Sequence, residues 1–343
     1  MNPSTDQPTT EQGGPLLVQR EGRVLHLELH RPHSLNALNH PMVKALRAEI
    51  TAASSDPEVD VVVLSGAGER AFSAGGDLKF LHTDATGTGA DALPFWADLY
   101  GVVADIDACA KPVVALMDGF VLGGGCGIAG NCPVRVVTER ATLGMPETRI
   151  GFYPDTGGLS MLQKLTGEVG TYLGTCSQSV NGVDAIAVGL ADHFVPSSDL
   201  PAFVEAIVTL GLDEALAAFA AVPTEEPTLP AAWVDECFAG DDPVAILDRL
   251  RAHEHPDAQA AAELYASRSP AAVAVTLKAL RVVADLTLAE DLALELRMTD
   301  RLRQSADFIE GVRARLVDKD RNPSWALADV SEVSPEWVDQ IVL

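Results

Sequence analysis

Two acidic residues lie eight positions apart in a stretch that also contains a run of three glycines. The stretch is residues 117–158, MDGFVLGGGCGIAGNCPVRVVTERATLGMPETRIGFYPDTGG, and each acid, Glu147 and Asp155, directly follows a proline. A carboxyl group in a partly apolar pocket has a raised pKa and can act as a base or nucleophile near neutral pH. Backbone amides of a glycine-rich turn can stabilise negative charge on oxygen. The combination predicts chemistry on a carbonyl group.

A second glycine loop lies upstream, in AFSAGGDLKFL at residues 71–81. When a thioester carbonyl is attacked or enolised, its oxygen gains negative charge, and a fixed backbone N–H is worth on the order of 100- to 1000-fold in rate. Glycine lets the backbone approach closely and adopt unusual dihedral angles. Either loop alone is equally well explained as a tight turn. Two such loops followed by a Pro-Glu acid favour an oxyanion hole.

Three segments carry a resemblance to a known family. Residues 117–158 and 71–81 resemble the crotonase (enoyl-CoA hydratase/isomerase) superfamily. Within the first, LGMPETRIGFYPDTGG is similar to the 3-hydroxyisobutyryl-CoA hydrolase branch, as is DFIEGVRARLVDKDRNPSW at residues 307–325. The resemblance covers residues 16–325. It implies an α/β fold, a crotonase-like spiral of repeated ββα units followed by a helical region.

The resemblance also implies roles for individual residues. Gly76 and Gly124 match the two oxyanion-hole donors. Glu147 would attack the thioester or activate water, and Asp155 would position water or an acyl hydroxyl. The residues matched to substrate and CoA binding are Asn36, Ala37, Ala74, Gly76, Asp77, Leu78, Gly124, Glu147 and Asp155. The resemblance implies neither a metal nor a separate cofactor, because CoA arrives as part of the substrate.

Two departures from the family pattern bear on the reaction and the substrate. Hydratases of the superfamily use two glutamates, and the second would directly follow GGGC, where this chain has Gly127. An isomerase needs only the acid that matches Glu147, so that alternative stays open. Relatives of the hydrolase branch place a glutamate that recognises the acyl hydroxyl just before a tyrosine. Here Tyr100 follows Leu99, with Asp98 one position further back, so the acyl group is left open.

Other motifs are weaker. Residues 125–130 spell G-x-G-x-x-G, the dinucleotide fingerprint, but DGFVLGG separates this motif from the preceding strand, and the unit lies mid-chain. We therefore disfavour a nicotinamide cofactor. His253 and His255 lack a zinc-site spacing on one helix face, so no metal site is expected. Cys126 is read as a small core residue rather than a reactive thiol.

Charge limits the possible partners. The 343-residue chain has 24 basic and 49 acidic residues and a formal net charge of −25. Such a field repels nucleic acid and anionic membranes, so neither is an expected partner, and no apolar run is long enough to span a bilayer. CoA is also an anion and needs a local basic patch. The candidates near the motifs are Arg31, Arg70, Lys79 and Lys111.

Cysteine usage and the amino terminus bear on location. The five cysteines are odd in number and form no C-x-x-C pair, which favours a reduced cytoplasmic protein. Residues 1–15 are polar and rich in proline and glycine, without an apolar signal core, and are expected to form a disordered tail. A homo-oligomer is possible from the resemblance.

Hydrophobic periodicity predicts alternating strands and helices, which favours α/β. Residues 16–200 are expected to form the spiral core with the active site, and residues 201–343 a helical region with a Pro-punctuated connection at 223–230. Strands are expected at 16–29, 59–64, 111–116 and 135–138, and helices at 41–53, 161–173, 183–188, 202–220 and 270–282.

These observations favour an acyl-CoA thioester hydrolase acting on a short branched 3-hydroxyacyl group, such as the 3-hydroxyisobutyryl-CoA of valine breakdown. An enoyl-CoA isomerase or hydratase with Glu147 as proton carrier is the second hypothesis. A non-catalytic acyl-CoA-binding or scaffold protein on the same fold is the third. Release of free CoA thiol separates the first from the other two.

Overall fold

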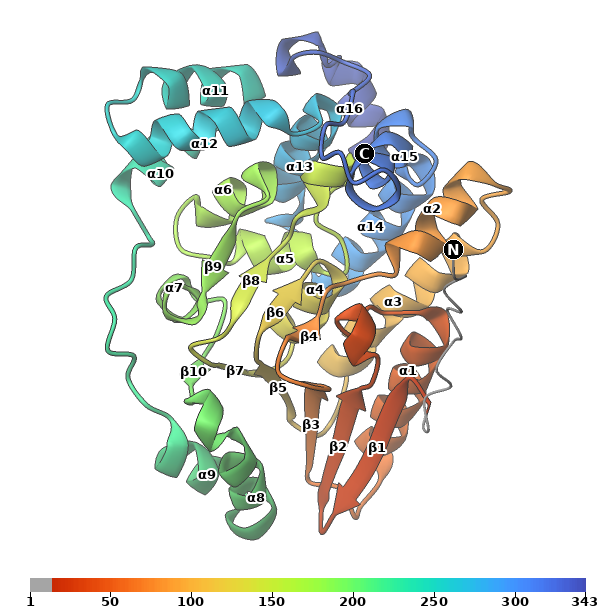
Figure 1. Ribbon diagram of the computed structural model, residues 1–343, viewed down its shortest axis with the longest axis vertical. Helices are drawn as coiled ribbons and strands as arrows, with labels where there is room; N and C mark the ends of the chain where they lie inside the picture. Colours follow the sequence, from red (N-terminus) through yellow and green to blue (C-terminus); the bar gives the residue numbers. More distant parts are fainter. Residues whose placement is uncertain (1–13) are drawn as a thin grey trace, which may run out of the picture.

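The computed structural model describes residues 14–343. The expected tail at residues 1–15 therefore lies almost wholly outside the described residues. The structure contains a six-stranded and a four-stranded β-sheet (Figure 1). One sheet runs in the order β1 (Leu16–Glu21), β2 (Val24–Leu29), β3 (Val61–Gly66), β5 (Val113–Met117), β7 (Val134–Val137) and β10 (His193–Phe194). The other runs in the order β4 (Ala71–Ser73), β6 (Phe120–Leu122), β8 (Thr142–Gly144) and β9 (Ser179–Asn181).

The chain repeats one step three times. Each of β3, β5 and β7 lies in the six-stranded sheet, and the strand that follows it, β4, β6 or β8, lies in the four-stranded sheet. A helical segment follows each pair before the next turn begins. These segments are α2 (Leu78–Thr86) with α3 (Ala92–Asp107), then α4 (Gly124–Gly130), then the 3-10 turn η2 (Glu147–Ile150) with α5 (Gly158–Gln163). The structure thus confirms the α/β spiral of ββα units.

Strand β3 shows why the six-stranded sheet is buried on both faces. Val62 and Leu64 join the main core, which also contains α1 (His40–Ser55), while Val61 and Val63 join a second apolar cluster on the opposite face. In the second cluster, α8 (Leu200–Leu210) and α9 (Leu212–Phe219) cover the sheet. A continuous run of β-branched residues is typical of such a doubly covered parallel strand.

The remaining helices complete the main core. They are α6 (Val169–Cys176), α7 (Gly182–Val188), α10 (Ala232–Phe238), α11 (Pro243–Ala252), α12 (Pro256–Ser267), α13 (Pro270–Val283), α14 (Leu288–Leu302), α15 (Ala306–Val312) and α16 (Pro335–Val342). Figure 1 shows the connection after α9 running along one side of the molecule to α10. The helical region from residue 201 therefore packs in two places, against the six-stranded sheet and against the core around α3 and α5.

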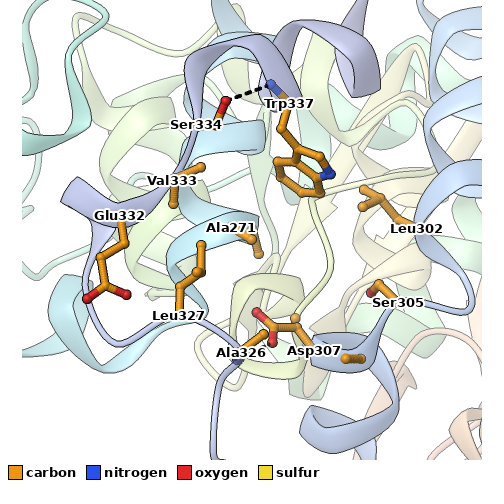
Figure 2. A pocket seen from close by; sticks show the side chains of 13 residues that line it. Ala271, Leu302, Ser305, Asp307, Ala326, Leu327, Glu332, Val333, Ser334 and Trp337 are labelled. Carbon is orange, nitrogen blue, oxygen red and sulfur yellow. Dashed lines mark hydrogen bonds between the residues drawn. The ribbon is translucent and has the colours of Figure 1, made fainter.

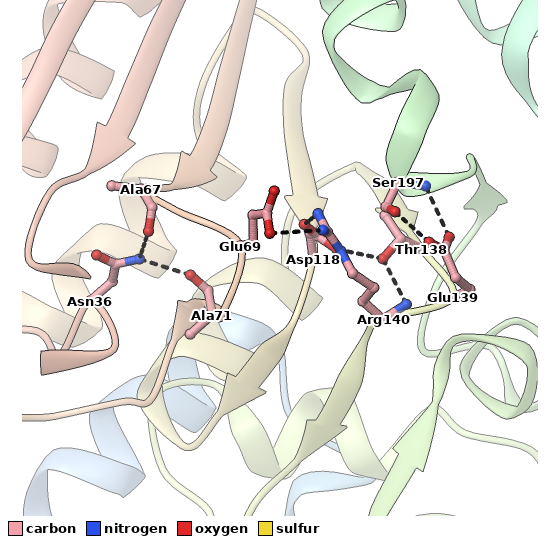
Figure 3. Close-up of polar contacts among 9 residues, drawn as sticks. All are labelled: Asn36, Ala67, Glu69, Ala71, Asp118, Thr138, Glu139, Arg140 and Ser197. Atoms are coloured by element: carbon pink, nitrogen blue, oxygen red, sulfur yellow. Dashed lines mark hydrogen bonds and ion pairs between the residues drawn. The ribbon is translucent and has the colours of Figure 1, made fainter. Parts of the chain in front are cut away.

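Polar contacts fix the turn that carries the chain from β5 to β6. The Asp118 carboxylate accepts hydrogen bonds from the Thr138 hydroxyl at 2.6 Å and from Arg140 Nε at 2.9 Å (Figure 3). Gly119 follows at φ +67°, where an added Cβ would lie 2.4 Å from the Arg70 carbonyl oxygen. The turn therefore needs glycine, and it delivers β6 to the second glycine-rich loop.

Most expected elements are confirmed, with changes at turns. The expected strand at 16–29 is a hairpin that turns at Gly22, whose φ is +56°. The expected helix at 161–173 is two helices, α5 and α6, and the expected helix at 202–220 is broken at Gly211, whose φ is +93°. The three-residue strands of the second sheet were not expected.

Candidate active site

The two glycine-rich loops meet at the carboxyl ends of β4 and β6. An added Cβ on Gly75, whose φ is +89°, would lie 2.9 Å from the Leu122 carbonyl oxygen and 3.2 Å from the Gly124 nitrogen. Only glycine allows this approach. Within residues 14–343, no backbone carbonyl accepts a hydrogen bond from the amide of Gly76 or of Gly124. Both residues line one cavity, so both expected oxyanion residues border the same space.

Both acids line that cavity as well. Glu147 begins η2 and is 7% exposed, and Asp155 is 6% exposed. Among the described residues, no group hydrogen-bonds Glu147 Oε2. The cavity has a volume of about 70 Å³ and is lined by Ala74, Gly75, Gly76, Leu78, Leu81, Phe95, Trp96, Leu99, Gly123, Gly124, Pro146, Glu147, Ile150, Phe152, Asp155 and Phe308. The local structure thus brings together all four predicted catalytic residues.

Burial controls the charge of the two acids. Burial and the neighbouring Asp155 charge raise the pKa of Glu147 well above its ordinary value. Burial also raises the pKa of Asp155 to about 6, although a hydrogen bond from Tyr100 opposes the rise. A raised pKa increases the basicity of a carboxylate, and two close carboxylates resist double ionisation. The pair is therefore suited to proton transfer or nucleophilic attack near neutral pH.

A network of hydroxyl groups is hydrogen-bonded to Asp155. The Tyr100 hydroxyl donates to Asp155 Oδ2 at 2.9 Å and lies 2.7 Å from Thr299 Oγ1. Tyr153 lies 2.8 Å from the same threonine oxygen and donates to the backbone oxygen of Glu295. Tyr100 is on α3, and Thr299 and Glu295 are on α14. Sequence analysis missed Thr299 and Glu295, because no local motif links residues 199 positions apart.

Glu295 holds the chain just beyond Asp155. Its carboxylate accepts hydrogen bonds from the amide of Gly157 at 2.8 Å and from that of Leu159 at 3.4 Å. The side chain is fully buried. Burial and the charges of Asp291 and Asp155 raise the pKa of Glu295 well above its ordinary value. This contact fixes the start of α5 and, through it, the backbone that follows Asp155.

The position of the second hydratase glutamate is closed. A Cβ added to Gly127 would lie 2.4 Å from the Thr156 carbonyl oxygen and 2.8 Å from its Cβ. Thr156 itself has a φ of +62°, so the backbone after Asp155 turns sharply here. The loop that delivers Asp155 therefore occupies the space that a side chain at position 127 would need.

Leu99 and Asp98 lie on different faces of α3. Leu99 lines the cavity. Asp98 accepts from Arg47 Nη1 at 2.9 Å and lies 2.7 Å from His40 Nε2, towards α1. Asp98 therefore does not line the cavity, and an apolar side chain stands where the family pattern has a glutamate.

Sequence similarity to known proteins extends over nearly the whole chain. A sequence profile described as enoyl-CoA hydratase/isomerase matches residues 24–342. The protein named "3-hydroxyisobutyryl-CoA hydrolase, mitochondrial" from Gallus gallus is 33% identical, over 96% of this chain and 89% of its own length. The rat protein of the same name is also 33% identical, over 94% of this chain and 86% of its own.

The chain belongs to the enoyl-CoA hydratase/isomerase family.

Solved structures agree on the crotonase fold. A carnitinyl-CoA dehydratase from Mycobacterium thermoresistibile is 40% identical with a TM-score of 0.93, covering 96% of this chain and 97% of its own. An enoyl-CoA hydratase from Rhodobacter sphaeroides 2.4.1 is 36% identical with a TM-score of 0.86, with the same coverage. These comparisons confirm the resemblance inferred from the sequence.

The residues matched to CoA binding in this family separate into two groups. Ala74, Gly76 and Leu78 line the cavity, together with Gly124 and the two acids. Asn36 does not: its amide donates to the carbonyls of Ala67 at 3.0 Å and Ala71 at 2.8 Å (Figure 3), and its oxygen accepts from an amide of the loop that follows β2. The Asn36 side chain is therefore committed to holding the loops around β4.

Asp77 and Ala37 are joined by Arg31. The Asp77 carboxylate caps α2 by accepting from the Lys79 amide at 3.2 Å and pairs with Arg31 at 3.1 Å. Arg31 also donates to the Ala37 carbonyl at 2.7 Å. Any contact of these loops with CoA would therefore involve backbone groups, the remaining donors of Arg31 or the exposed side chain of Lys79.

The other candidate groups are placed as follows. Lys111 directly precedes β5, whereas the glycine loops follow β4 and β6. It lies near Asp56 and Asp60, whose pKa values are lowered chiefly by hydrogen bonds from the Glu58 amide and from Arg23 and only in small part by the Lys111 charge. Burial raises the pKa of the Cys126 thiol to about 12, so this cysteine stays protonated in the core. Within residues 14–343, no cluster of three His, Cys, Asp or Glu side chains could hold a metal ion, and no helix could cross a membrane.

Figure 2 shows a second, apolar cavity, which is larger than the catalytic one. Its volume is about 440 Å³, and it lies between α13, α15 and the segment that leads into α16. Ile150 and Phe308 line the catalytic cavity, while their neighbours Gly151 and Asp307 line the larger one. Asp307 is already bonded by the Ser269 hydroxyl at 2.5 Å and the Ala326 amide at 2.8 Å. Glu332, the other acid that lines this cavity, accepts from the Ala328 amide at 3.0 Å. Both acids of the larger cavity therefore already accept hydrogen bonds, whereas Glu147 Oε2 in the catalytic cavity has no partner among the described residues.

Proposed function

We propose that this chain hydrolyses a short branched 3-hydroxyacyl-CoA thioester, with 3-hydroxyisobutyryl-CoA as the substrate and 3-hydroxyisobutyrate and CoA as the products. The observation that carries the proposal is the arrangement of the second acid: the loop that brings Asp155 to the cavity also closes position 127. The names of the relatives that are 33% identical over most of this chain support the same reaction.

The chemistry divides between the loops and the acids. The amides of Gly76 and Gly124 would donate to the thioester oxygen as it becomes an oxyanion. Glu147 would attack the carbonyl carbon, expel the CoA thiolate and leave an anhydride that water cleaves. Alternatively, it would take a proton from a water molecule that attacks directly. In both routes the C–S bond breaks, the thiolate takes up a proton, and one water molecule is consumed. Asp155 would position the water or the acyl hydroxyl.

The cavity favours a small acyl group. Its volume of about 70 Å³ and its apolar walls, including Leu99, Phe152 and Phe308, suit a few carbon atoms rather than a long chain. At Leu99 the wall offers no hydrogen bond to a 3-hydroxyl group. Glu147 is assigned to the attack on the thioester, so Asp155, which accepts from Tyr100 at 2.9 Å, is the acid left to contact the 3-hydroxyl group. We therefore assign hydroxyl recognition to Asp155.

The alternative is a hydratase or dehydratase, which is what the two most similar solved structures described above are called. That reaction adds or removes water across a carbon–carbon double bond and releases no thiol. It would require Asp155 to replace the second glutamate. An isomerase needs only Glu147 and likewise releases no thiol.

The test is thiol release from a panel of acyl-CoA esters, read with a thiol-trapping dye. The wild-type protein should release CoA thiol from 3-hydroxyisobutyryl-CoA. Glu147→Gln keeps the shape but removes the nucleophile or base, so kcat should fall on the order of 1000-fold or more. The matched control is Glu263→Gln on α12, because Glu263 is exposed and outside the cavity. Thiol release by Glu147→Gln at the wild-type rate would refute the assignment.

Several expectations stay predictions. The names of the animal relatives place those proteins in mitochondria, so they do not support a cytoplasmic location for this chain. We expect no cofactor other than the CoA of the substrate, and activity that survives exhaustive dialysis with a chelator would support this. Light scattering tests whether the protein forms a homo-oligomer. A non-catalytic acyl-CoA-binding role would be supported by CoA ester binding without turnover of any panel member.

A further inference from the structure

Three arginines from distant parts of the chain gather behind the catalytic turn η2. Arg149 donates to the Ser177 carbonyl, and Arg268 donates through Nε to the adjacent Cys176 carbonyl at 2.8 Å. Arg315, in the π-helical turn η4 (Arg313–Val317), is close enough for its charge to lower the pKa of both other arginines. Arg149 is two residues beyond Glu147, so the cluster adjoins the active-site turn without lining the cavity.

These three side chains are poorly neutralised. Within residues 14–343, none of them forms an ion pair with a carboxylate, and the Nε atoms of Arg149 and Arg315 are buried without a hydrogen-bond partner. Burial and the neighbouring guanidinium groups lower the pKa of Arg268 to about 10. Arg321 extends the cluster, because its charge lowers the pKa of Arg315. Arg268 is buried and Arg149 and Arg315 are partly exposed, so the cluster is a partly buried concentration of positive charge.

This lack of carboxylate partners is unusual in so acidic a chain. With 49 acidic residues against 24 basic ones, most arginines could find a counter-charge. Arg313, only two positions from Arg315, pairs with Glu310, Asp318 and Asp320. Burying charges that repel one another costs free energy unless an anion compensates it. Guanidinium groups match the oxygen geometry of phosphate with paired hydrogen bonds.

We propose that Arg149, Arg268 and Arg315 form a binding site for a phosphate group. The phosphate is supplied either by the CoA portion of the substrate or by free inorganic phosphate. Occupation of the site would neutralise the cluster and order the backbone beside Glu147, since the Ser269 amide next to Arg268 also donates to the Thr148 carbonyl at 3.3 Å. The phosphate site itself does not depend on the proposed thioesterase activity; only its CoA source does.

The first measurement is titration of the wild-type protein with inorganic phosphate, followed by calorimetry and by thermal unfolding at constant ionic strength. Phosphate should bind saturably and raise Tm by a few °C, because a ligand that binds only the folded state stabilises it. Arg315→Gln should abolish saturable binding. In phosphate-free buffer the same variant should have an equal or higher Tm than wild type, because it removes repulsion. This crossing of the two Tm values is not expected from a merely structural arginine.

A control variant and a second cluster variant separate loss of phosphate binding from loss of charge or of folding. Arg297→Gln removes the same charge from the exposed face of α14, where its side chain bonds only its own helix, and should leave phosphate binding intact. Arg149→Gln should weaken phosphate binding even if Arg315→Gln folds poorly. Phosphate binding that is equal in wild type, Arg315→Gln and Arg149→Gln, or absent from wild type without any kinetic effect below, would overturn the proposal.

Kinetics with two substrates identify the source of the phosphate. If the CoA phosphates occupy the site, Arg315→Gln should raise KM for the acyl-CoA about tenfold and leave kcat/KM for the corresponding acyl-pantetheine, which has no phosphate, unchanged. If free phosphate is the ligand, KM for both substrates should match wild type in phosphate-free buffer. A Glu147→Gln protein that still binds phosphate would separate this site from the catalytic proposal.

Discussion

Replacing Tyr100 by phenylalanine removes one hydroxyl and leaves the ring packed in the core. That hydroxyl donates to Asp155 Oδ2 at 2.9 Å, and burial and nearby acids raise the pKa of Tyr100 well above its ordinary value, so it stays a donor. A hydrogen bond to a charged group is worth about 1.5 to 3 kcal/mol. Because 1.36 kcal/mol corresponds to one pKa unit, loss of the bond should raise the pKa of Asp155 by roughly 1 to 2 units.

The assay is the pH dependence of kcat/KM for thiol release. In wild type, Asp155 has a pKa of about 6 and the pKa of Glu147 is also raised well above its ordinary value, so the acid limb reports both carboxyl groups. Tyr100→Phe acts on the Asp155 part of this limb, because Tyr100 donates to Asp155. In Tyr100→Phe the acid limb should move up by roughly 1 to 2 pH units, while activity on the alkaline side of the shifted limb approaches the wild-type plateau. Tyr265→Phe is the control, because Tyr265 is also buried but donates to the Pro243 carbonyl at 3.2 Å, away from the acids.

An unchanged acid limb in Tyr100→Phe would show that ionisation of Asp155 does not limit turnover and that Glu147 sets the limb, which would refute this prediction. A shift to lower pH would contradict the sign of the argument, because the tyrosine would then be stabilising the protonated acid. A uniform loss of activity at every pH, equal in the two tyrosine variants, would point to disturbed packing instead. Only a shift confined to the acid limb supports the role of Tyr100 as a positioning residue.

Three further predictions concern the acids and the cavity. Because burial raises the pKa of Asp155 from 3.8 to about 6, the folded state should lose up to about 3 kcal/mol as pH rises from 4 to 7, and Asp155→Asn should unfold at a higher temperature than wild type at pH 7.5 but not at pH 4. Hydration of crotonyl-CoA, followed by loss of enoyl absorbance, should be negligible, since position 127 carries glycine; ordinary hydratase rates would contradict this. Selectivity for the 3-hydroxyl should be modest, because Leu99 offers it no hydrogen bond and Asp155 is the acid assigned to it; a kcat/KM for isobutyryl-CoA more than about 10⁴-fold below that for the hydroxy form would require a recognition residue in addition to Asp155.

Much of the first sheet could be predicted from the sequence. The run at Val61–Gly66 follows from β-branched residues alone, because such runs pack well when both faces are covered. The second sheet could not be predicted in this way. Each of its strands has three residues, which is too short for an alternating pattern to stand out. Their positions are set by pairing between successive turns of the spiral.

The active site divides in the same way. Glu147, Asp155 and the glycine loops lie in local motifs, so residue type and spacing identify them. Thr299 and Glu295 approach from α14, and nothing in their local sequence distinguishes them from other buried helix residues. Asn36 shows the opposite case. A motif identifies it as a CoA-binding residue, but its side chain forms three hydrogen bonds to backbone groups and does not line the cavity.

The Thr156 carbonyl occupies the space that a side chain at position 127 would need. The hydrolase acid Asp155 and a hydratase glutamate at position 127 therefore exclude one another. A glutamate at position 127 would need the backbone after Asp155 to move, since even its Cβ would lie 2.4 Å from that oxygen. A single substitution at 127 should therefore give a damaged hydrolase and not a hydratase. Descent from one activity to the other would require the Asp155 loop to change first, through an intermediate that has lost one acid before gaining the other. Steric exclusion thus prevents a stepwise change of single residues between hydrolysis and hydration. Replacement of the whole Asp155 loop is the more accessible change.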